Sequence, residues 1–497
     1  MPQPLDAPAG FLGAKKNSQG DERPETPSCE AKPTQRPFVI PAEVLIQNLR
    51  PLVYNELFRA RNSTGRPVGG TLTQPKPPQS RPGPEGTVFI GREISWRRTF
   101  AALRYRNYRL WYFGQMLSLM GSWMQTTAQG YLVFQLTKSP AFLGYVGFAA
   151  GAPSWLFMLY GGVIADRVPR RTLLIYTQTA MMSLAFVLSA LSFTGLVRPW
   201  HIVILASLMG VAMAFDVPAR QAFVLELVAR KDLANAIALN STMFNSATVV
   251  GPAVAGVIYA LFGPAWCFLV NGISFLAIII ALSLMRIDHE PRTEGRVSAF
   301  AELKEGVRYA VHEPMIRTII MIVGATSLFG FSFATLIPAW AVKVLGGGAT
   351  TNGYLQSARG LGALLSALLI ATLSHYEIKG KLLTVGTVVF PVLLFGFSLV
   401  RWFPLSLVMM LGVGAALIQI MNLANALVQT LVPDRLRGRV MSVYGLTFFG
   451  LMPLGALWIG QAAQHLGEPT AVMVGAAASM AVAALVFLRV PGVRRLR

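Results

Sequence analysis

Four ionisable side chains lie within or at the edge of long apolar stretches, where a charge is costly unless it is paired or functional. Asp216 and Arg220 are four residues apart, so on a helix they share one face and can neutralise each other. Arg359 lies well inside an otherwise apolar stretch, and Asp166 lies near the end of another. A carboxylate in such a place can carry a proton and a guanidinium can bind an anion, so these residues are the first candidates for chemistry.

Each of these candidates also has a purely structural interpretation. The pair of Asp216 and Arg220, near the end of its helix, can serve only to hold helices together. Arg359 can extend along apolar surface until its guanidinium reaches the polar side of a membrane. If Arg359 instead faces a water-filled space, it is the best candidate to contact an anionic part of a small molecule. The residue types leave both interpretations open.

Asp166 belongs to the stretch GGVIADRVPRR, which ends at Arg171. At the C-terminal end of a helix the macrodipole disfavours a carboxylate, so Asp166 needs a positive partner. That partner is either an arginine of the same stretch, such as Arg170, or the N-terminus of another helix. Gly162, one turn earlier, would let such a helix approach closely. The arginines alone could also merely anchor the end of a span.

One apolar stretch carries many uncharged hydrogen-bonding side chains. This composition suits a helix that lines an aqueous path, although such residues also serve helix packing. Gln125 and Gln129 in this stretch, with the apolar surface of Trp123, are candidates to contact a substrate, and Asn422 in a later stretch is a weaker one. The series comprises Gln115, Ser118, Ser122, Gln125, Thr126, Thr127 and Gln129.

The short stretch GPAVAG contains Gly251, Pro252 and Gly256. Proline removes one backbone donor from a helix, and the glycines permit a bend or a tight contact with a neighbour. The stretch therefore predicts a kinked helix that packs closely.

Composition indicates which elements must position these residues. The chain has 497 residues, of which 54% are hydrophobic and 13% charged, with a mean hydropathy of +0.52. This is too apolar for a soluble globular protein of such length. A membrane-spanning helix needs about 20 mostly apolar residues. We predict an all-α membrane protein with twelve transmembrane helices, near residues 108–136, 141–165, 172–196, 200–222, 236–260, 264–285, 315–342, 351–374, 382–400, 403–425, 439–463 and 469–488.

The basic residues set the expected orientation. A formal net charge of +21 could suggest nucleic acid, but the placement of Lys and Arg between the spans argues against it. With a cytoplasmic N-terminus, the cytoplasmic gaps hold 26 of these residues and the outer gaps hold 4. Because basic residues accumulate on the cytoplasmic side, we expect a multi-pass protein of the plasma (inner) membrane with both termini in the cytoplasm.

The chain divides into five parts by composition. Residues 1–95 are rich in Pro, Gly and Ser and are predicted to be a disordered cytoplasmic tail. Two six-helix halves follow, at 96–285 and 315–490, separated by a cytoplasmic central loop at 286–314 and followed by a basic cytoplasmic end at 491–497. A faint repeat supports the division, because LVARKDLANAIALNS and TLVPDRLRGRVMSVY lie 203 residues apart and occupy the same loop of each half.

These stretches resemble a known family. GGVIADRVPRRTLL resembles the signature of the loop between helices 2 and 3 in the major facilitator superfamily, and GPAVAG is similar to the Gly-Pro motif of its antiporters. The run from NYRLWYFGQ to FLG and the run from FDVPARQAF to GPAVAG resemble the bacterial exporter branch that includes enterobactin and macrolide exporters. The resemblance covers roughly residues 96–490. It implies the major facilitator fold, with two pseudo-symmetric halves and the substrate site between them.

The resemblance also implies roles for individual residues. Gly162, Asp166, Arg170 and Arg171 would form a gating latch that closes the cytoplasmic side against helix 11, which is expected to begin near Arg439. Gly251, Pro252 and Gly256 would restrict leak.

The expected function is that of a secondary active transporter. It would export an amphipathic small molecule of the drug or siderophore class by alternating access, with proton coupling. The alternatives are a membrane-embedded lipid-modifying enzyme, for which the five histidines are too scattered, and a transporter-like sensor. We expect no catalytic residue, metal, cofactor or nucleic-acid partner. The expected partners are a small molecule, the lipid bilayer and protons, and the chain is expected to be a monomer.

Overall fold

The computed structural model describes residues 100–286, 299–373 and 378–489. The predicted tail at 1–95, most of the first part of the central loop and the basic end at 491–497 lie outside the described residues. The described part of the chain contains helices and no strand, as predicted. All of it belongs to one compact unit that extends over Gly91–Arg497.

The first six long helices form one group. A proline at the first helical position begins α4, α6 and α8, where its missing N–H costs no hydrogen bond. Gly263 has a φ of 89° between α7 and α8, a conformation that favours glycine and allows the sharp turn. The bounds are α3 Arg106–Thr137, α4 Pro140–Arg167, α5 Arg170–Phe193, α6 Pro199–Leu227, α7 Leu233–Phe262 and α8 Pro264–Ser283, with short turns η1 Ala101–Arg104 and η2 Arg230–Asp232.

The second group begins with the short helix α9 (Ala299–His312) and contains five continuous long helices and one interrupted span. The continuous helices are α12 Ala349–Leu373, α13 Lys379–Leu399, α14 Phe403–Leu431, α15 Asp434–Leu466 and α16 Glu468–Arg489. The predicted span at 315–342 is instead divided into α10 Pro314–Ala325, a π-helical turn η3 Thr326–Gly330, a 3-10 turn η4 Phe331–Leu336, α11 Ile337–Ala339 and a π-helical turn η5 Trp340–Val344.

Ten helices of the described residues are long and apolar enough to cross a membrane, so the prediction of twelve spans is confirmed for ten. The two long helices that this count omits are α3 and α12, which carry the polar residues singled out above. Several helices also extend beyond the predicted spans. For example, α14 continues to Leu431, past the expected end at 425, because a helix can continue into water after it leaves the apolar layer.

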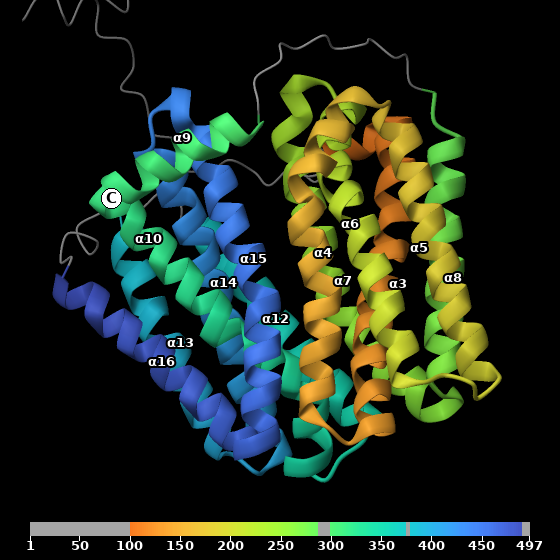
Figure 1. Cartoon of the computed structure of the whole chain (residues 1–497). Coiled ribbons are helices and arrows are strands. Elements are labelled where there is room, and N and C mark those ends of the chain that lie inside the picture. The colour runs from red at the N-terminus through yellow and green to blue at the C-terminus, as the bar shows by residue number, and fades with distance from the viewer. Residues whose placement is uncertain (1–99, 287–298, 374–377, 490–497) are drawn as a thin grey trace, which may run out of the picture. The chain divides into compact units, whose positions relative to one another are not determined.

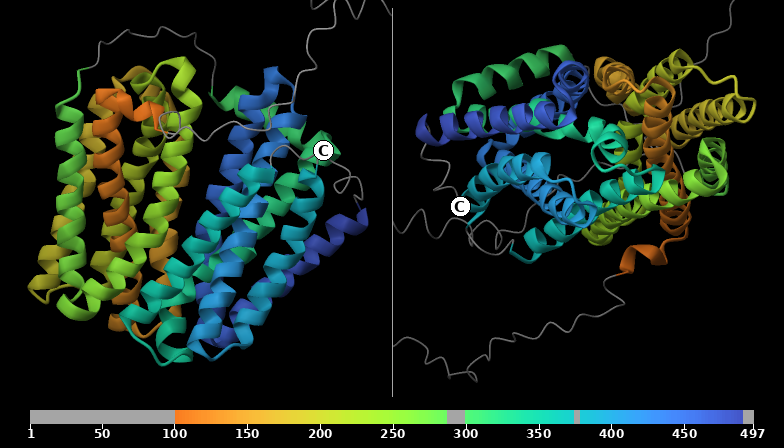
Figure 2. Two further views of the ribbon diagram at one scale, coloured as in Figure 1. Left: turned by 180° about the vertical axis from the view of Figure 1, so that it is seen from behind. Right: turned by 90° about the horizontal axis from the view of Figure 1, so that it is seen from below.

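The helices form two bundles that lie side by side (Figure 1). We use the term α9 end for the end of the bundles that holds α9 and the turn between α4 and α5, and far end for the opposite one, where α3 turns into α4. The two bundles meet where α4 packs on α15 and α7 packs on α12. In Figure 1 the ribbons of α4 and α15 diverge toward the α9 end, and Figure 2 shows the two bundles from behind and from below.

Glycine residues bring the two bundles into backbone contact. A Cβ added to Gly144 of α4 would lie 2.7 Å from the carbonyl oxygen of Ala456 and 3.2 Å from the Cα of Gly460, both on α15. A Cβ added to Gly353 of α12 would lie 2.4 Å from the carbonyl oxygen of Pro252 on α7. We call these two close contacts between the bundles, α4 with α15 and α7 with α12, the glycine seams. Both depend on the absence of side chains at the glycines.

Candidate functional site

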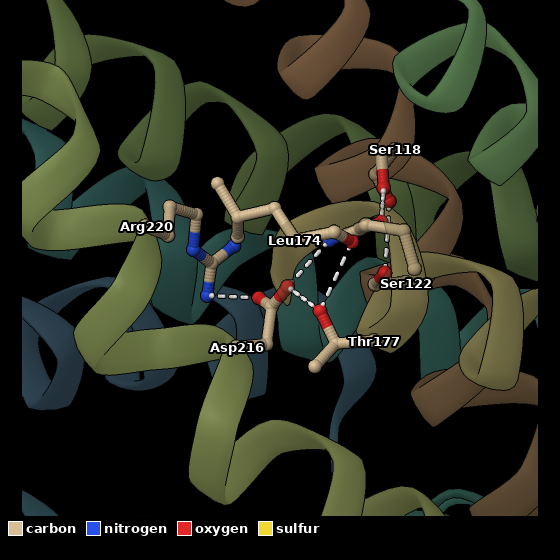
Figure 3. A network of polar contacts seen from close by, with 7 residues as sticks. Ser118, Ser122, Leu174, Thr177, Asp216 and Arg220 are labelled. Atoms are coloured by element: carbon tan, nitrogen blue, oxygen red, sulfur yellow. Dashed lines mark hydrogen bonds and ion pairs between the residues drawn. The ribbon is translucent and has the colours of Figure 1, made fainter. Parts of the chain in front are cut away.

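The buried carboxylate of Asp216 is the centre of a polar network inside the first bundle (Figure 3). Its side chain is 1% exposed. Oδ1 accepts hydrogen bonds from the hydroxyl of Thr177 at 3.0 Å and from Nε2 of Gln178 at 2.8 Å, both on α5. Oδ2 lies 3.5 Å from a guanidinium nitrogen of Arg220, one turn along α6. The expected pair of Asp216 and Arg220 is present, and two neutral donors hydrogen-bond to the same carboxylate.

The network continues to α3, the helix with the polar series. Oε1 of Gln178 accepts a hydrogen bond from the hydroxyl of Ser118 at 3.4 Å, and the carbonyl of Ser118 accepts one from Ser122 at 2.8 Å. The network therefore joins α3, α5 and α6 within the low-dielectric interior. Two neutral donors and the Arg220 guanidinium surround the carboxylate, so both of its buried oxygens have a polar partner. Thr177 and Gln178 were not predicted, although their polar types inside an apolar stretch were a usable signal.

Asp166 at the end of α4 is largely exposed, with a side-chain exposure of 75%. Its nearest charged partner is Arg170, at 3.4 Å, and Arg170 makes a shorter ion pair of 2.7 Å with Glu226 of α6. Arg171 donates to the carbonyls of Leu282 and Ser283 at 2.7 and 2.9 Å, so it caps the C-terminal end of α8. Of the two partners considered for Asp166, the arginine of its own stretch is the one seen here.

The close helix contact expected at Gly162 is absent, because a Cβ added there would have no neighbour within 4 Å. The tight position is the preceding residue, Gly161, where a Cβ would lie 2.0 Å from the carbonyl oxygen of Ala214 on α6. No helix packs on Gly162 in this conformation, so the approach of α15 to this position stays a prediction for another conformation.

The start of α15 is engaged by α9 instead. Arg439 forms ion pairs with Glu305 and, at 3.8 Å, with Glu302, both on α9. Arg435 lies 3.8 Å from Glu305. A Cβ added to Gly306 would lie 2.5 Å from the carbonyl oxygen of Arg439, so the helices are in close contact. The helix α9 therefore binds the helix at which Asp166 is predicted to dock.

The polar series of α3 is divided between buried and accessible positions. Gln125 is buried, and its Oε1 accepts a hydrogen bond of 2.7 Å from Asn271 of α8, so it faces the interior of its own bundle. Trp123 is half-buried and meets Phe244 of α7 edge-on, with ring centroids 6.0 Å apart. Gln129 is half-buried, and Asn422 of α14 is exposed. The structure does not bring these four residues together into one contact.

GPAVAG lies in α7 and touches two helices. A Cβ added to Gly251 would lie 2.6 Å from the Cβ of Trp123 and 2.8 Å from the carbonyl oxygen of Met120, both on α3. A Cβ added to Gly256 would lie 3.0 Å from the carbonyl oxygen of Ala349 on α12. Pro252, between them, is inside the helix. The close packing predicted for this stretch is therefore present.

Arg359 is half-buried in α12 and has no carboxylate partner among the described residues. Its guanidinium carbon lies 5.5 Å from the ring centroid of Phe331, in the interrupted span. Its Nε is buried and has no hydrogen-bond partner within the described ranges. Phe331 in turn meets Phe448 of α15 edge-on, with centroids 6.2 Å apart.

Polar contacts that the sequence did not predict join the bundles at the far end. The hydroxyl of Ser139 donates to Oε1 of Gln464 at 2.7 Å. Nε2 of Gln461 donates to the hydroxyl of Tyr145 at 2.8 Å.

A further far-end contact is an ion pair. Lys343 lies 2.8 Å from the buried carboxylate of Glu468, and its amine is 5.5 Å from the ring centroid of Phe134 on α3. Lys343 thus contacts both bundles. Lys343 is one of the four basic residues of the outer gaps, and single residues at opposite ends of a half give no sequence signal for a pair.

Two helical bundles with polar and charged groups buried between apolar helices define a polytopic membrane transporter of the major facilitator class. The chain belongs to the family of transmembrane secretion effectors, whose family model matches residues 97–495. The described residues hold no group of three or more His, Cys, Asp or Glu side chains placed to bind a metal ion.

Several characterised proteins are similar in sequence. The staphyloferrin A transporter of Staphylococcus aureus is 24% identical over 72% of this chain and 90% of that protein. The multidrug efflux pump Tap of Mycolicibacterium fortuitum is 26% identical over 71% of this chain and 88% of that protein. Macrolide efflux protein A of Streptococcus pyogenes is 21% identical over 73% of this chain and 92% of that protein.

Solved structures confirm the fold. The nucleoside transporter NupG aligns with a TM-score of 0.60 and 15% identity, over 78% of this chain and 98% of that one. A D-xylose-proton symporter aligns with a TM-score of 0.61 and 14% identity, over 77% of this chain and 98% of that one. At these identities the likeness concerns the fold alone.

Proposed function

We propose that this protein is a secondary exporter that moves amphipathic small molecules of the drug or siderophore class out of the cytoplasm by alternating access. Relatives that are named a staphyloferrin A transporter, a multidrug efflux pump and a macrolide efflux protein support this class of cargo. The family match favours transport over the alternatives of a lipid-modifying enzyme and a sensor. The structural observation that carries the proposal is the placement of contacts between the bundles.

Those contacts run from the far end to the middle of the bundles. They begin at Ser139 and Gln464 and continue to Trp155 of α4, whose indole lies against Gly450 of α15. Further toward the α9 end, Tyr160 of α4 is 66% exposed. This arrangement is expected of a transporter that is closed at the far end and open at the α9 end.

We assign the α9 end to the cytoplasm. The supporting observation is the excess of Lys and Arg in the loops of this end, which orients short loops toward the cytoplasm. Both termini are then cytoplasmic, the membrane is the plasma (inner) membrane, and the conformation described here is open to the cytoplasm.

Closure of the cytoplasmic side would bring Asp166, Gly162, Arg170 and Arg171 to the start of α15. There the positive end of the helix macrodipole would stabilise the carboxylate of Asp166, which its own helix disfavours. Gly162, open in this conformation, would then accept the approaching helix. We propose proton coupling as the energy source, and we propose that the protein works as a monomer.

The test is substrate accumulation in bacterial cells that lack their own efflux pumps. Cells with the wild-type protein should accumulate less of at least one probe among a macrolide, a fluorescent amphipathic cation and a polycarboxylate siderophore. The variant Asp166→Asn should abolish this difference, because the neutral amide loses the attraction to the positive helix end. Leu225→Ala, an exposed apolar position on α6, serves as a control that should leave export unchanged. Equal accumulation of every probe with and without the wild-type protein would refute export.

A further inference from the structure

The face of α12 that carries Arg359 is polar along its length. Asn352, Gln356 and Arg359 follow one another at intervals of four and three residues, so they share one face of the helix. Nδ2 of Asn352 donates to the carbonyl of Thr127 on α3 at 3.4 Å, and Nε2 of Gln356 donates to Oδ1 of Asn352 at 3.4 Å. Because Thr127 belongs to the other bundle, this polar face is directed to the space between the two bundles.

The depth of Arg359 sets it apart from the basic residues at the helix ends. It is ten residues from the start of α12 at Ala349, which at 1.5 Å per residue places it about 15 Å from the far end of the helix. A hydrocarbon core is about 30 Å thick, so Arg359 lies near its middle. A cation at that depth needs a counter-charge or water.

The described residues supply Arg359 with an aromatic surface and no counter-charge. The ring of Phe331 lies beneath the guanidinium, and a ring face offsets only part of the cost of burying a cation. Another arginine of the same bundle shows the contrast. Arg401 lies 5.7 Å from the ring centroid of Trp340 but also donates to the carbonyls of Ser398 and Val400, at 2.8 and 3.1 Å.

The aromatic surface beside Arg359 is held in place by the interrupted span. The hydroxyl of Ser327, in the π-helical turn, donates to the carbonyl of Phe448 at 2.7 Å, which fixes α15 against this span. Phe331 follows in the 3-10 turn and meets the Phe448 ring. Irregular backbone at membrane depth is tolerated where it is buried in protein or lines a cavity, and π-helical turns frequently occur at functional sites.

We propose that Arg359 and Phe331 form an anion subsite for the cargo, and that the preferred cargo is an organic anion in which a carboxylate is joined to a flat apolar group. The planar guanidinium donates in a fork that matches a carboxylate. The ring of Phe331, with Phe448 behind it, offers a surface on which a flat group can lie. This inference rests on the proposed export function in one respect, namely that the bound anion is the transported substrate. The subsite itself can be tested by binding alone.

The experiment measures binding of two matched probes to the purified full-length protein by isothermal titration calorimetry. The probes are 2-naphthoate and 2-naphthamide, which have the same ring and differ in charge. The wild-type protein should bind naphthoate about tenfold or more tightly than the amide, as expected for charge-assisted hydrogen bonds. Arg359→Gln should remove this preference, whereas Arg359→Lys should retain part of it because a point charge remains.

Two further variants separate the subsite from general charge and from misfolding. Arg401→Gln removes an arginine of the same bundle whose guanidinium is already hydrogen-bonded, and it should keep the full preference for naphthoate. Phe331→Leu keeps the charge and should weaken the binding of both probes. Equal binding of the two probes to wild type, no binding of naphthoate, or an unchanged preference in Arg359→Gln would overturn the proposal.

The failure of this inference is distinguishable from the failure of the export function. If cells with the wild-type protein export a macrolide but the purified protein shows no preference for naphthoate, the subsite is wrong and export stands. If naphthoate binds in the expected manner but no probe is exported, the export function is wrong.

Discussion

Arg439 at the start of α15 forms an ion pair with Glu305 of α9, at the helix end where the sequence predicts that Asp166 docks. The helix α9 thus supplies a carboxylate to α15 while the carboxylate of Asp166 on α4 is exposed. The two carboxylates would compete for one helix end, so the contact between α9 and α15 should stabilise the conformation described here.

Removal of this ion pair should shift the protein toward the state closed at the α9 end. In Glu305→Gln a partly exposed ion pair is lost, which is typically worth about 0.2–1 kcal/mol, so the ratio of the two states should change by up to about fivefold. Spin labels at two exposed positions, Tyr160→Cys on α4 and Ser442→Cys on α15, would report the distance between the helices by pulsed electron resonance. Asp434→Asn removes an ion pair within α15 and should not shift the distribution.

Truncation of the buried carboxylate should destabilise the first bundle. Asp216→Ala leaves the Gln178 amide and the Arg220 guanidinium without the carboxylate that they contact, and the loss of one partner of a buried pair costs about 3–5 kcal/mol. The midpoint of denaturant unfolding in detergent should fall clearly. Glu226→Ala, which removes a partly exposed partner of Arg170, should cost no more than about 1 kcal/mol. Similar midpoints for the two variants would contradict the central place of Asp216 in the network.

A side chain at Gly162 should affect transport but not stability in the conformation described here. The position is open, and glycine inside a helix is about 1 kcal/mol less favourable than alanine, so Gly162→Ala should be neutral or slightly stabilising. If α15 packs on this position when the α9 end closes, Gly162→Leu should slow export while the thermal unfolding midpoint stays at or above that of wild type. Wild-type export rates in Gly162→Leu would show that no helix approaches there.

A side chain added where α7 packs on α12 should, in contrast, lower the stability of the protein. A Cβ at Gly353 would lie 2.4 Å from the backbone carbonyl of Pro252, and backbone cannot move aside as a flexible side chain does. Gly353→Ala should therefore separate the two helices and lower stability by about 1–3 kcal/mol. The measurement is the unfolding midpoint of the purified protein. Gly438→Ala on α15, where a Cβ would meet nothing within 4 Å, is the matched control and should leave the midpoint within error.

The fold was largely predictable, because long apolar runs and the asymmetry of basic residues are local signals that survive in a single sequence. The interruption of the span at 315–342 was not, since its residues are as apolar as those of a regular helix and its irregular turns contact residues far along the chain, Phe390 and Phe448. The pair of Asp216 and Arg220 was predictable from its spacing. Its partners on α5 were not, because contacts between helices have no fixed separation in sequence.

The glycine seam between the bundles has a consequence for how easily they move. Long side chains at an interface lose rotamer freedom when they are buried, at up to about 2 kcal/mol each, whereas glycine has none to lose. At Gly144 and Gly460 the two bundles meet through backbone atoms alone. One bundle can therefore rotate against the other there with little change in side-chain conformational entropy. The energetic barrier to the motion then comes from the polar groups around the seam, among them the hydrogen bond between Ser139 and Gln464.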